Sequence, residues 1–248
     1  MIALDKLFNP AQRKRLVAAI PSRVSCRAYT APPSTADWAS LAYAAERYRL
    51  PGARLALCRV DEVLFTGTLL GMGRITGCTT VAAVIATPSE PLSRLSAGVL
   101  GEAFALEATS LGLGTCWVSG TYRKRLLDVP LEDGEIVLCV IAVGVPAPDS
   151  MDASNRKRKP IERIAKGYDR WPATYRDVAR AVQAAPSAMN MQPWQLLLEG
   201  KRFILDGPDR SLLDLGIGLC HAELTLPLHG AWQFGSARGE PICWAEVR

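Results

Sequence analysis

The sequence is poor in the residues that usually bind metals or form covalent cross-links. It has only two histidines, His221 and His229, and its seven scattered cysteines include no CxxC pair. Zinc sites need histidines and cysteines at close spacing, and a disulfide framework needs paired cysteines. We therefore expect no metal site, and both histidines are interpreted as ordinary residues. The scattered thiols indicate a reducing compartment, so we expect a cytoplasmic protein.

The chain also lacks long hydrophobic runs and a strong excess of one charge. Its longest apolar stretch, IVLCVIAVGV, is as long as a strand, whereas a membrane helix needs roughly 18–20 apolar residues. The N-terminal segment has no sustained apolar region before a small-residue cleavage site, so we expect no signal peptide. The net charge of +5 over 248 residues favours an anionic ligand only weakly. We expect neither nucleic acid nor a membrane as a partner.

Hydrophobic residues make up 49% of the chain, enough to build a sizeable core. Periodicity and capping signals predict helices at 6–20, 34–50, 93–111 and 174–185, and a helix or buried segment at 211–224. Apolar runs bounded by turn residues predict strands at 51–65, 79–88, 135–146 and 194–206. The first and last of these four runs are interpreted as strand–turn–strand units, and the N-cap of the second helix as Ser34 or Thr35.

Two windows of the chain, starting at Asp37 and Asp177, have the same pattern. Each has an Ala-rich helix that ends in Ala-Ala, a loop with proline, and then a strand, a short turn and a strand. The likeness predicts a duplication of half the fold, with chance as the alternative. The first window has ERYRLPGARL where the second has the polar loop PSAMNMQPW, so only one copy would keep special chemistry.

The segment PSAMNMQPW, residues 186–194, combines amides, a hydroxyl, two prolines and a tryptophan. A solvent loop needs no tryptophan, and burying an unpaired amide costs roughly 1–3 kcal/mol. This composition indicates polar groups held still beside a flat ligand.

Two basic segments suit an anion. RVSCR places Arg23, Ser25 and Arg27 at alternate positions, hence on one face of an extended chain. Guanidinium groups bind phosphate through paired donors. RKRKP, with Arg156 and Arg158, can add positive charge. For both segments a solvated basic loop is the alternative.

The segment LGLGTCWVSG follows the helix 93–111 and not a strand, so it lacks the context of a dinucleotide-binding loop. It suits a helix C-cap with Gly112 or Gly114 in the left-handed region, or a close approach of backbone N–H groups to a ligand near Ser119 and Gly120. Glu107 lies mid-face on the preceding helix, and we expect it to be paired structurally. No GxSxG segment is present, which argues against a hydrolase.

Taken together, RVSCR, GLGTCW, RKRKP and PSAMNMQPW resemble the flavin-dependent nitroreductase family. The PSxxNxQPW loop matches at every fixed position, and the resemblance spans about residues 21–224. Val24 stands where the family has a second arginine. The loop comes late in the chain, an order that resembles the single-chain branch labelled "TM nitroreductase", in which TM does not mean transmembrane.

The resemblance implies an FMN site built from thirteen residues: Arg23, Ser25, Arg27, Trp117, Val118, Ser119, Gly120, Arg156, Arg158, Pro186, Ser187, Ala188 and Asn190. The first three would hold the phosphate or ribityl end, and residues 186–190 would border the flavin. Residues 117–120 would run past the isoalloxazine, with a backbone N–H near Ser119 or Gly120 directed at N5. Gln192 and Trp194 would brace the loop.

The resemblance also implies an α+β fold, a three-layer α-β-α arrangement with a central, mostly antiparallel sheet. Residues 1–248 would form a single domain, with half-repeats at roughly 21–165 and 170–248 that form an internal pseudo-dimer. One FMN site per chain is expected, in a monomer or a homodimer.

The implied activity is that of an FMN-dependent oxidoreductase. NAD(P)H would reduce the flavin, which would pass electrons to a nitroaromatic, quinone or similar flat small molecule by a ping-pong mechanism. The cofactor carries this chemistry, so no side chain is expected to be a catalytic residue. The alternatives are a specialised biosynthetic or dehalogenating role, or a flavin-binding protein without turnover, which Val24 keeps open.

Overall fold

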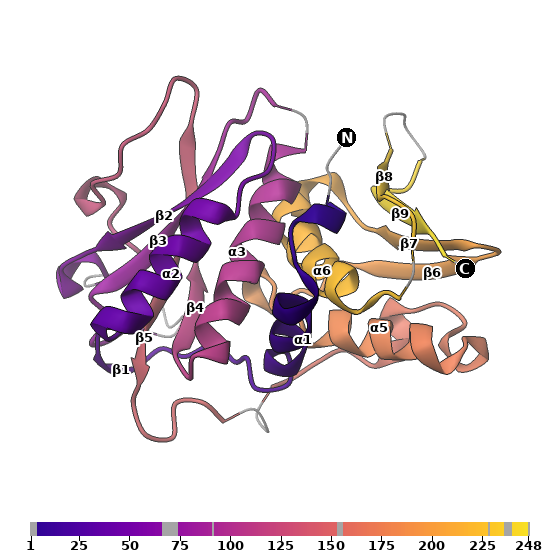
Figure 1. Ribbon diagram of the computed structural model, residues 1–248, viewed down its shortest axis with the longest axis horizontal. Coiled ribbons are helices and arrows are strands. Elements are labelled where there is room, and N and C mark those ends of the chain that lie inside the picture. Colours follow the sequence, from indigo (N-terminus) through magenta and orange to yellow (C-terminus); the bar gives the residue numbers. More distant parts are fainter. Residues whose placement is uncertain are drawn as a thin grey trace.

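The computed structural model describes residues 4–65, 74–90, 92–152, 156–227, 229–235 and 240–247, so both ends of the expected 1–248 domain lie outside the described residues. Helices and antiparallel sheets are both present, which confirms the α+β class (Figure 1). Among the helices in these ranges, none combines the length and the apolar character that crossing a membrane requires.

The first part of the chain builds a five-stranded sheet and three helices. Its elements are α1 (Pro10–Ala19), β1 (Tyr29–Ala31), α2 (Thr35–Arg47), β2 (Ala53–Arg59), β3 (Thr80–Ala86), α3 (Ser93–Ser110), β4 (Gly114–Val118) and β5 (Ile136–Pro146). The strand order is β1-β5-β3-β2, with β4 also paired to β5, and every pair is antiparallel. β3 is buried along its whole length, as expected of a continuous apolar run covered on both faces.

The second part of the chain builds a smaller sheet. Its elements are α4 (Ile161–Ile164), α5 (Ala173–Ala184), β6 (Gln195–Glu199), β7 (Arg202–Asp206), α6 (Leu212–Thr225), β8 (Gln233–Phe234) and β9 (Cys243–Glu246). The strand order is β6-β7-β9-β8, again antiparallel throughout. Part of the larger sheet has the corresponding order, β2-β3-β5-β4. Along the chain α3 lies between β3 and β4, just as α6 lies between β7 and β8.

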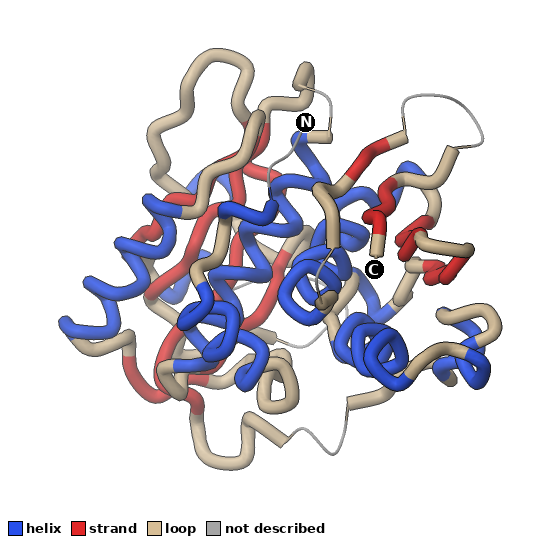
Figure 2. The backbone as a smooth tube through the Cα atoms, turned by 45° about the vertical axis from the view of Figure 1, so that its right-hand side comes forward, coloured by secondary structure: helices blue, strands red, loops and turns tan. Residues whose placement is uncertain are grey.

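Helices α3 and α6 lie side by side in the middle of the molecule, with one sheet beyond each of them (Figures 1 and 2). Both helices are buried around nearly their whole circumference, because each packs on the other helix and on its own sheet. The strands therefore form two sheets separated by these helices, whereas the family resemblance implied one central sheet.

Most predicted elements are observed, with three differences. The first helix begins at Pro10 rather than at residue 6, because Asn9 caps it through a capping box with Gln12. DEVLF forms a 3-10 helix at Glu62–Phe65 instead of a strand, and β2 pairs with the later strand β3. Residues 114–118 of the Gly-rich segment form β4, a strand that was not predicted, because they pair with β5. The N-cap of α2 is Ser34, whose hydroxyl accepts from the Asp37 N–H.

Candidate functional site

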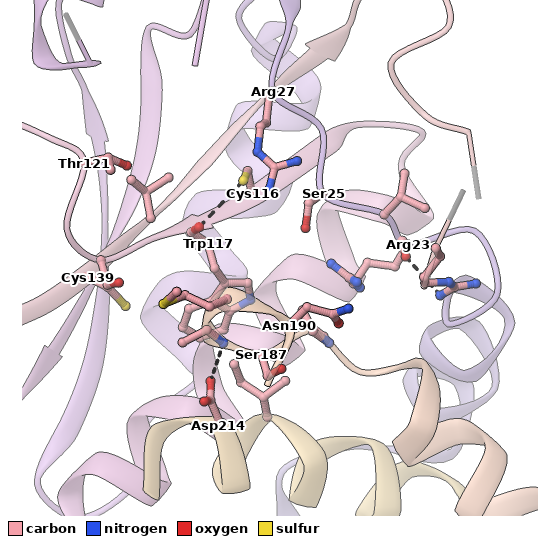
Figure 3. Close-up of a pocket in the computed structure, with 18 of the residues that line it drawn as sticks. Arg23, Ser25, Arg27, Cys116, Trp117, Thr121, Cys139, Ser187, Asn190 and Asp214 are labelled. Atoms are coloured by element: carbon pink, nitrogen blue, oxygen red, sulfur yellow. Dashed lines mark hydrogen bonds between the residues drawn. The ribbon is translucent and has the colours of Figure 1, made fainter. Parts of the chain in front are cut away.

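A cavity of about 610 Å³ lies between the larger sheet, the start of α6 and the loop that precedes β6. All thirteen residues of the implied site line it: Arg23, Ser25, Arg27, Trp117, Val118, Ser119, Gly120, Arg156, Arg158, Pro186, Ser187, Ala188 and Asn190. Figure 3 shows Arg27, Ser25 and Cys116 on one side and Ser187, Asn190 and Asp214 on the other. Four segments that are far apart in the sequence therefore meet at one place.

The cavity wall also contains residues that the sequence analysis did not assign to the site. These are Val24, Ile75, Cys116, Thr121, Cys139, Asp152, Lys157, Met189, Leu213, Asp214 and Ile217. Five of them are sequence neighbours of assigned residues. Val24, Lys157 and Met189 lie between assigned positions, and Cys116 and Thr121 flank the segment 117–120. Leu213, Asp214 and Ile217 share one face of α6 at its start, and only the helical spacing hinted at a common direction.

Arg23 is the buried cation of the site. It is 1% exposed, and its Nε and Nη1 atoms have no hydrogen-bond partner among the described residues. Its nearest carboxylate is Glu102, 3.5 Å from Nε. Figure 3 shows the guanidinium directed toward the middle of the cavity. A buried cation with unsatisfied donors is costly, and an anion in the cavity would satisfy it.

Ser25 and Arg27 follow Arg23 along the edge of β4. The chain is held there by a parallel bridge between Ser25 and Thr115 and by a 2.8 Å hydrogen bond from the Cys26 N–H to the Thr115 oxygen. This pairing keeps the segment extended, and alternate side chains reach the same cavity. Arg23, Ser25 and Arg27 all line the cavity, as does Val24, which lies between the first two.

Arg156 and Arg158 use most of their donors on the protein itself. Arg156 donates to the carbonyls of Pro21 at 2.7 Å and Arg23 at 3.2 Å, and Arg158 donates to Ala184 O at 2.9 Å and Asn190 Oδ1 at 3.1 Å. Burial, and then repulsion by Arg23, lowers the pKa of both guanidinium groups, that of Arg158 to about 10. The two arginines thus brace the cavity walls and add positive potential.

The loop 186–192 is fixed by its own amides and hydroxyl. Gln192, 3% exposed, accepts from the Lys159 N–H at 2.8 Å and donates to the Asn190 oxygen at 3.0 Å. The Ser187 hydroxyl accepts from the Gln192 N–H at 2.8 Å. Met189, Asn190 and Gln192 have φ values of 49°, 56° and 45°, in the left-handed region. The hydrogen bonds therefore hold a strained backbone in one shape.

The N-terminus of α6 is tied to the same loop. Asp214 lies in the first turn and accepts a hydrogen bond from the Ala188 N–H at 2.9 Å. Burial raises the pKa of the Asp214 carboxyl, and this hydrogen bond opposes the rise. Trp194, fully buried, anchors the other end of the loop in the core. The expectation that Gln192 and Trp194 brace the loop agrees with these contacts.

The end of β4 supplies a flat wall and an open backbone. The Trp117 indole donates from Nε1 to Glu102 at 3.0 Å, and its ring lies against Gly101, where a Cβ would be 2.8 Å from Cζ2. The ladder to β5 ends at Val118, so Ser119 and Gly120 lie beyond it and are exposed. A Cβ on Gly120 would meet no atom within 4 Å. The backbone here is accessible from the cavity.

Residues outside the cavity have structural contacts. Glu107 accepts from the Tyr48 hydroxyl at 2.7 Å and pairs with Arg15 at 2.6 Å, which confirms its structural pairing. Gly112, with φ of +80°, directly follows Leu111, the C-cap of α3, and lies in the left-handed region, whereas Gly114 begins β4. In the described ranges no group of histidine, cysteine and carboxylate side chains could hold a metal ion.

Comparison with known proteins gives matches that run over most of the chain. A family model described as "Putative TM nitroreductase" matches residues 15–226. No curated protein matches the chain. The structure of a "putative nitroreductase" from Thermotoga maritima is 22% identical, with a TM-score of 0.62, and the match covers 94% of this chain and 93% of that one. At this identity the likeness shows the fold alone.

Two structures that contain FMN are less similar. The nitroreductase with bound FMN from Desulfitobacterium hafniense is 18% identical with a TM-score of 0.44, over 59% of this chain and 98% of that one. A "putative nitroreductase" in complex with FMN from Desulfovibrio desulfuricans is 21% identical with a TM-score of 0.45, over 63% of this chain and 95% of that one. Both scores lie below 0.5 and show nothing further about this chain. The family model matches most of its length, and the protein belongs to the TM nitroreductase family.

Proposed function

We propose that this protein is an FMN-dependent oxidoreductase. It would use NAD(P)H to reduce nitroaromatic, quinone or similar flat small molecules. One observation carries the proposal. Thirteen residues chosen by their likeness to a flavin-binding family, from four distant segments, line a single cavity of about 610 Å³. Cavities of this size hold cofactor-sized ligands, which typically need roughly 300–1,000 Å³.

The residues in the cavity fit FMN. Two nitrogens of the buried Arg23 have no hydrogen-bond partner among the described residues, and an anion such as the FMN phosphate could accept hydrogen bonds from them. Arg23, Ser25 and Arg27 would hold the phosphate and ribityl end. The loop 186–190 and the segment 117–120 would border the ring system, where the open backbone at Gly120 permits a close approach.

When bound, FMN would supply the redox chemistry by accepting a hydride from NAD(P)H and passing electrons to the acceptor. The protein's part is to bind, orient and stabilise. Positive charge from Arg23, Arg156 and Arg158 favours an anionic ligand. The exposed backbone at Ser119 and Gly120 would offer it N–H groups. No side chain needs to act as a nucleophile or general base.

We further propose one FMN site per chain. The two sheets have corresponding strand orders, and their helices α3 and α6 pack together as the central pair, which supports half-repeats at roughly 21–165 and 170–248 within one domain. The phosphate grip comes from the first half and the loop from the second. Such an internal pseudo-dimer would work as a monomer, and a homodimer remains compatible with it. All seven thiols are free, which supports a reducing cytoplasm.

The alternative is a flavin-binding protein with a specialised biosynthetic or dehalogenating role, or without turnover. The observation that favours it is Val24, which lines the cavity where the family has an arginine, and which is 7% exposed. An apolar side chain there offers the phosphate one guanidinium fewer.

An absorbance spectrum tests the proposal. The purified protein is incubated with excess FMN and desalted, the flavin is counted per chain, and NADH or NADPH is then added without oxygen. We expect about one flavin per chain, bleached by the nicotinamide. Arg23→Met should lose the flavin, and Arg180→Met, which changes an exposed arginine that pairs with Asp177, should keep it.

The other results each contradict part of the proposal. Half a flavin per chain would mean that the site is shared between chains. Bound flavin that neither nicotinamide reduces would favour the alternative without turnover. A colourless protein would exclude an FMN enzyme.

A further inference from the structure

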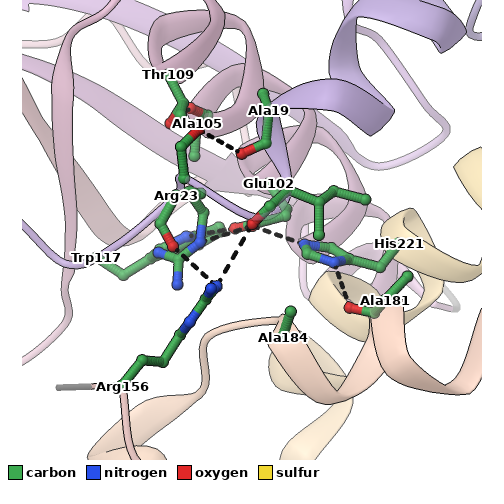
Figure 4. Close-up of polar contacts among 12 residues, drawn as sticks. Ala19, Arg23, Glu102, Ala105, Thr109, Trp117, Arg156, Ala181, Ala184 and His221 are labelled. Carbon is green, nitrogen blue, oxygen red and sulfur yellow. Dashed lines mark hydrogen bonds and ion pairs between the residues drawn. The ribbon is translucent and has the colours of Figure 1, made fainter. Parts of the chain in front are cut away.

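A carboxylate with no exposed surface lies directly behind the cavity wall. Glu102, on α3, accepts from the Trp117 indole at 3.0 Å through Oε2. Its Oε1 is 2.9 Å from His221 Nε2 and 3.5 Å from Arg23 Nε (Figure 4). Trp117 and Arg23 line the cavity, whereas His221 does not. One buried carboxylate therefore connects the site to a histidine in the core.

The second nitrogen of His221 fixes how many protons this group holds. Nδ1 is 2.7 Å from the carbonyl oxygen of Ala181, on α5. A carbonyl oxygen only accepts, so Nδ1 must carry a proton. The contact between Nε2 and Glu102 Oε1 then holds one further proton, on the imidazole or on the carboxyl. In both cases Glu102 and His221 together are electrically neutral.

Because this pair is neutral, Glu102, the carboxylate beside Arg23, supplies no net counter-charge to it. Arg23 is 1% exposed, and neither Nε nor Nη1 has a hydrogen-bond partner among the described residues. Arg156 and Arg158 are also close, but they are cations and already donate to backbone carbonyls. The cluster of Arg23, Glu102 and His221 thus carries a net single positive charge in a buried place, which an anion in the cavity would offset.

We propose that His221 is a positioning residue that neutralises Glu102 and so keeps the positive charge of Arg23 available to an anionic group bound in the cavity. Without His221, Glu102 would be an unshared anion beside Arg23, and the two would neutralise each other. The ligand's anion would then meet no net charge. The role of His221 is thus to set charge through two other residues, without touching the ligand.

This mechanism makes an unusual prediction for combined substitutions. His221→Gln should weaken the binding of an anion, because it leaves Glu102 to pair with Arg23. Glu102→Gln should not weaken it, because Arg23 then has no anionic neighbour in the cluster. The double variant His221→Gln, Glu102→Gln should recover what the single histidine variant loses. A role limited to packing would make the double variant the worst of the three.

The inference rests on the proposed function for the identity of the anion, the FMN phosphate. The test compares the Kd for FMN with that for riboflavin, which lacks the phosphate, by fluorescence titration of each variant. We expect His221→Gln to lower the preference for FMN about tenfold or more, the effect of losing one charge-assisted contact. Riboflavin affinity should change little, and the double variant should regain the preference.

The chain offers a matched control. His229 is the only other histidine, and its Nε2 is 3.3 Å from Glu223 Oε2. Glu223 is a second fully buried carboxylate. It also pairs with Arg13 and accepts a hydrogen bond from the Trp232 indole at 2.8 Å. None of these four residues lines the cavity. His229→Gln should leave the preference for FMN unchanged. An equal change in both histidine variants, or no change in His221→Gln, would overturn the inference while FMN binding stands.

Two further measurements separate this inference from the proposed function. If the wild type binds neither flavin, the proposed function fails, and inorganic phosphate is titrated while the thermal unfolding midpoint is followed. Phosphate should raise the midpoint of the wild type and the double variant more than that of His221→Gln, and equal rises would overturn the inference. If His221→Gln does not fold, the ¹⁵N NMR spectrum of the wild-type histidine side chains shows which nitrogens of His221 carry a proton. A protonated Nδ1 is expected, and an unprotonated Nδ1 would overturn the inference.

Discussion

Gly98 of α3 and Gly216 of α6 face each other, backbone to backbone, where the two central helices cross. A Cβ on Gly98 would lie 2.9 Å from the Cα of Gly216, and a Cβ on Gly216 would lie 3.0 Å from the Cα of Gly98. Each would also collide with the carbonyl oxygen three residues before the other glycine, Leu213 or Leu95. Such a reciprocal contact is typical of a two-fold interface, and it supports the proposed internal pseudo-dimer.

Alanine at this crossing should destabilise the protein. Either Gly98→Ala or Gly216→Ala forces the helices apart, because the colliding atoms are backbone and cannot rotate away. We expect the free energy of unfolding to fall by about 1–3 kcal/mol, as for overpacked cores, measured by urea denaturation. Gly230→Ala is the control, since the nearest atoms to its Cβ are 3.8 Å away. Equal stability of all three variants would mean that the helices do not approach this closely.

The loop at Asn190 should prefer glycine to alanine. Asn190 has φ of 56°, where a Cβ costs about 1–2 kcal/mol. Both Asn190→Gly and Asn190→Ala remove the amide, so the difference between their free energies of unfolding reports the backbone alone. We expect the glycine variant to be more stable by up to about 1 kcal/mol. At Ser187, whose φ is −148°, the order should reverse and alanine should be the more stable replacement.

Neutralising Asp214 should stabilise the protein at neutral pH. Burial raises the pKa of its carboxyl in the folded state, so the folded protein holds this proton more tightly than the unfolded chain does. The free energy of unfolding therefore falls as pH rises through the ordinary pKa and the raised one.

Asp214→Asn keeps an oxygen for the Ala188 N–H and removes this dependence. In urea denaturation it should be more stable than the wild type at pH 7, and the gain should disappear below the ordinary pKa of 3.8. Asp177→Asn, at an exposed aspartate, should show no comparable gain. A gain that persists unchanged at low pH would exclude burial of the charge as its cause.

The pair formed by Arg54 and Glu135 should give the opposite pH dependence. Arg54 donates to the two carboxylate oxygens at 2.7 Å and 2.6 Å, and these hydrogen bonds lower the pKa of Glu135. The stabilisation is present above the unfolded pKa and is lost as pH falls through the lowered folded pKa. Glu135→Gln should cost less than about 1 kcal/mol at pH 7 and nothing once both states are protonated. A cost that is independent of pH would mean that the ion pair is not its source.

Much of the architecture could be predicted from local signals. The apolar runs at 79–88 and 135–146 became β3 and β5, and the long pattern at 93–111 became α3. DEVLF was misassigned because a short apolar run does not specify its pairing partner. β2, which ends at Arg59, pairs instead with β3, which begins at Thr80. The division into two sheets was missed for the same reason, since strand patterns do not specify which strands pair.

The residues of the candidate site also divide into those that the sequence predicted and those that it did not. Residues in short, dense segments, such as Arg23 and the 186–190 loop, were assigned because these segments resemble motifs of a known family. Asp214 and Glu102 were not, because each is a lone carboxylate in a helical segment of apolar residues, and nothing nearby in the sequence shows what it contacts. Glu102 contacts His221, 119 positions away, and that contact exists only after α3 and α6 pack together.

By itself the sequence determined the helices, most strands, the caps and the segments that could form a binding site, because propensity, periodicity and capping act over a few residues. The tertiary structure decided which segments meet, which charges are buried, and which of them lack a partner. Those outcomes depend on apolar surfaces far apart in the chain packing together, and on the close approach of two helices at Gly98 and Gly216. The Arg23 guanidinium lies buried beside a neutral pair, and two of its nitrogens have no hydrogen-bond partner in the described part of the chain. That arrangement is a property of the packing.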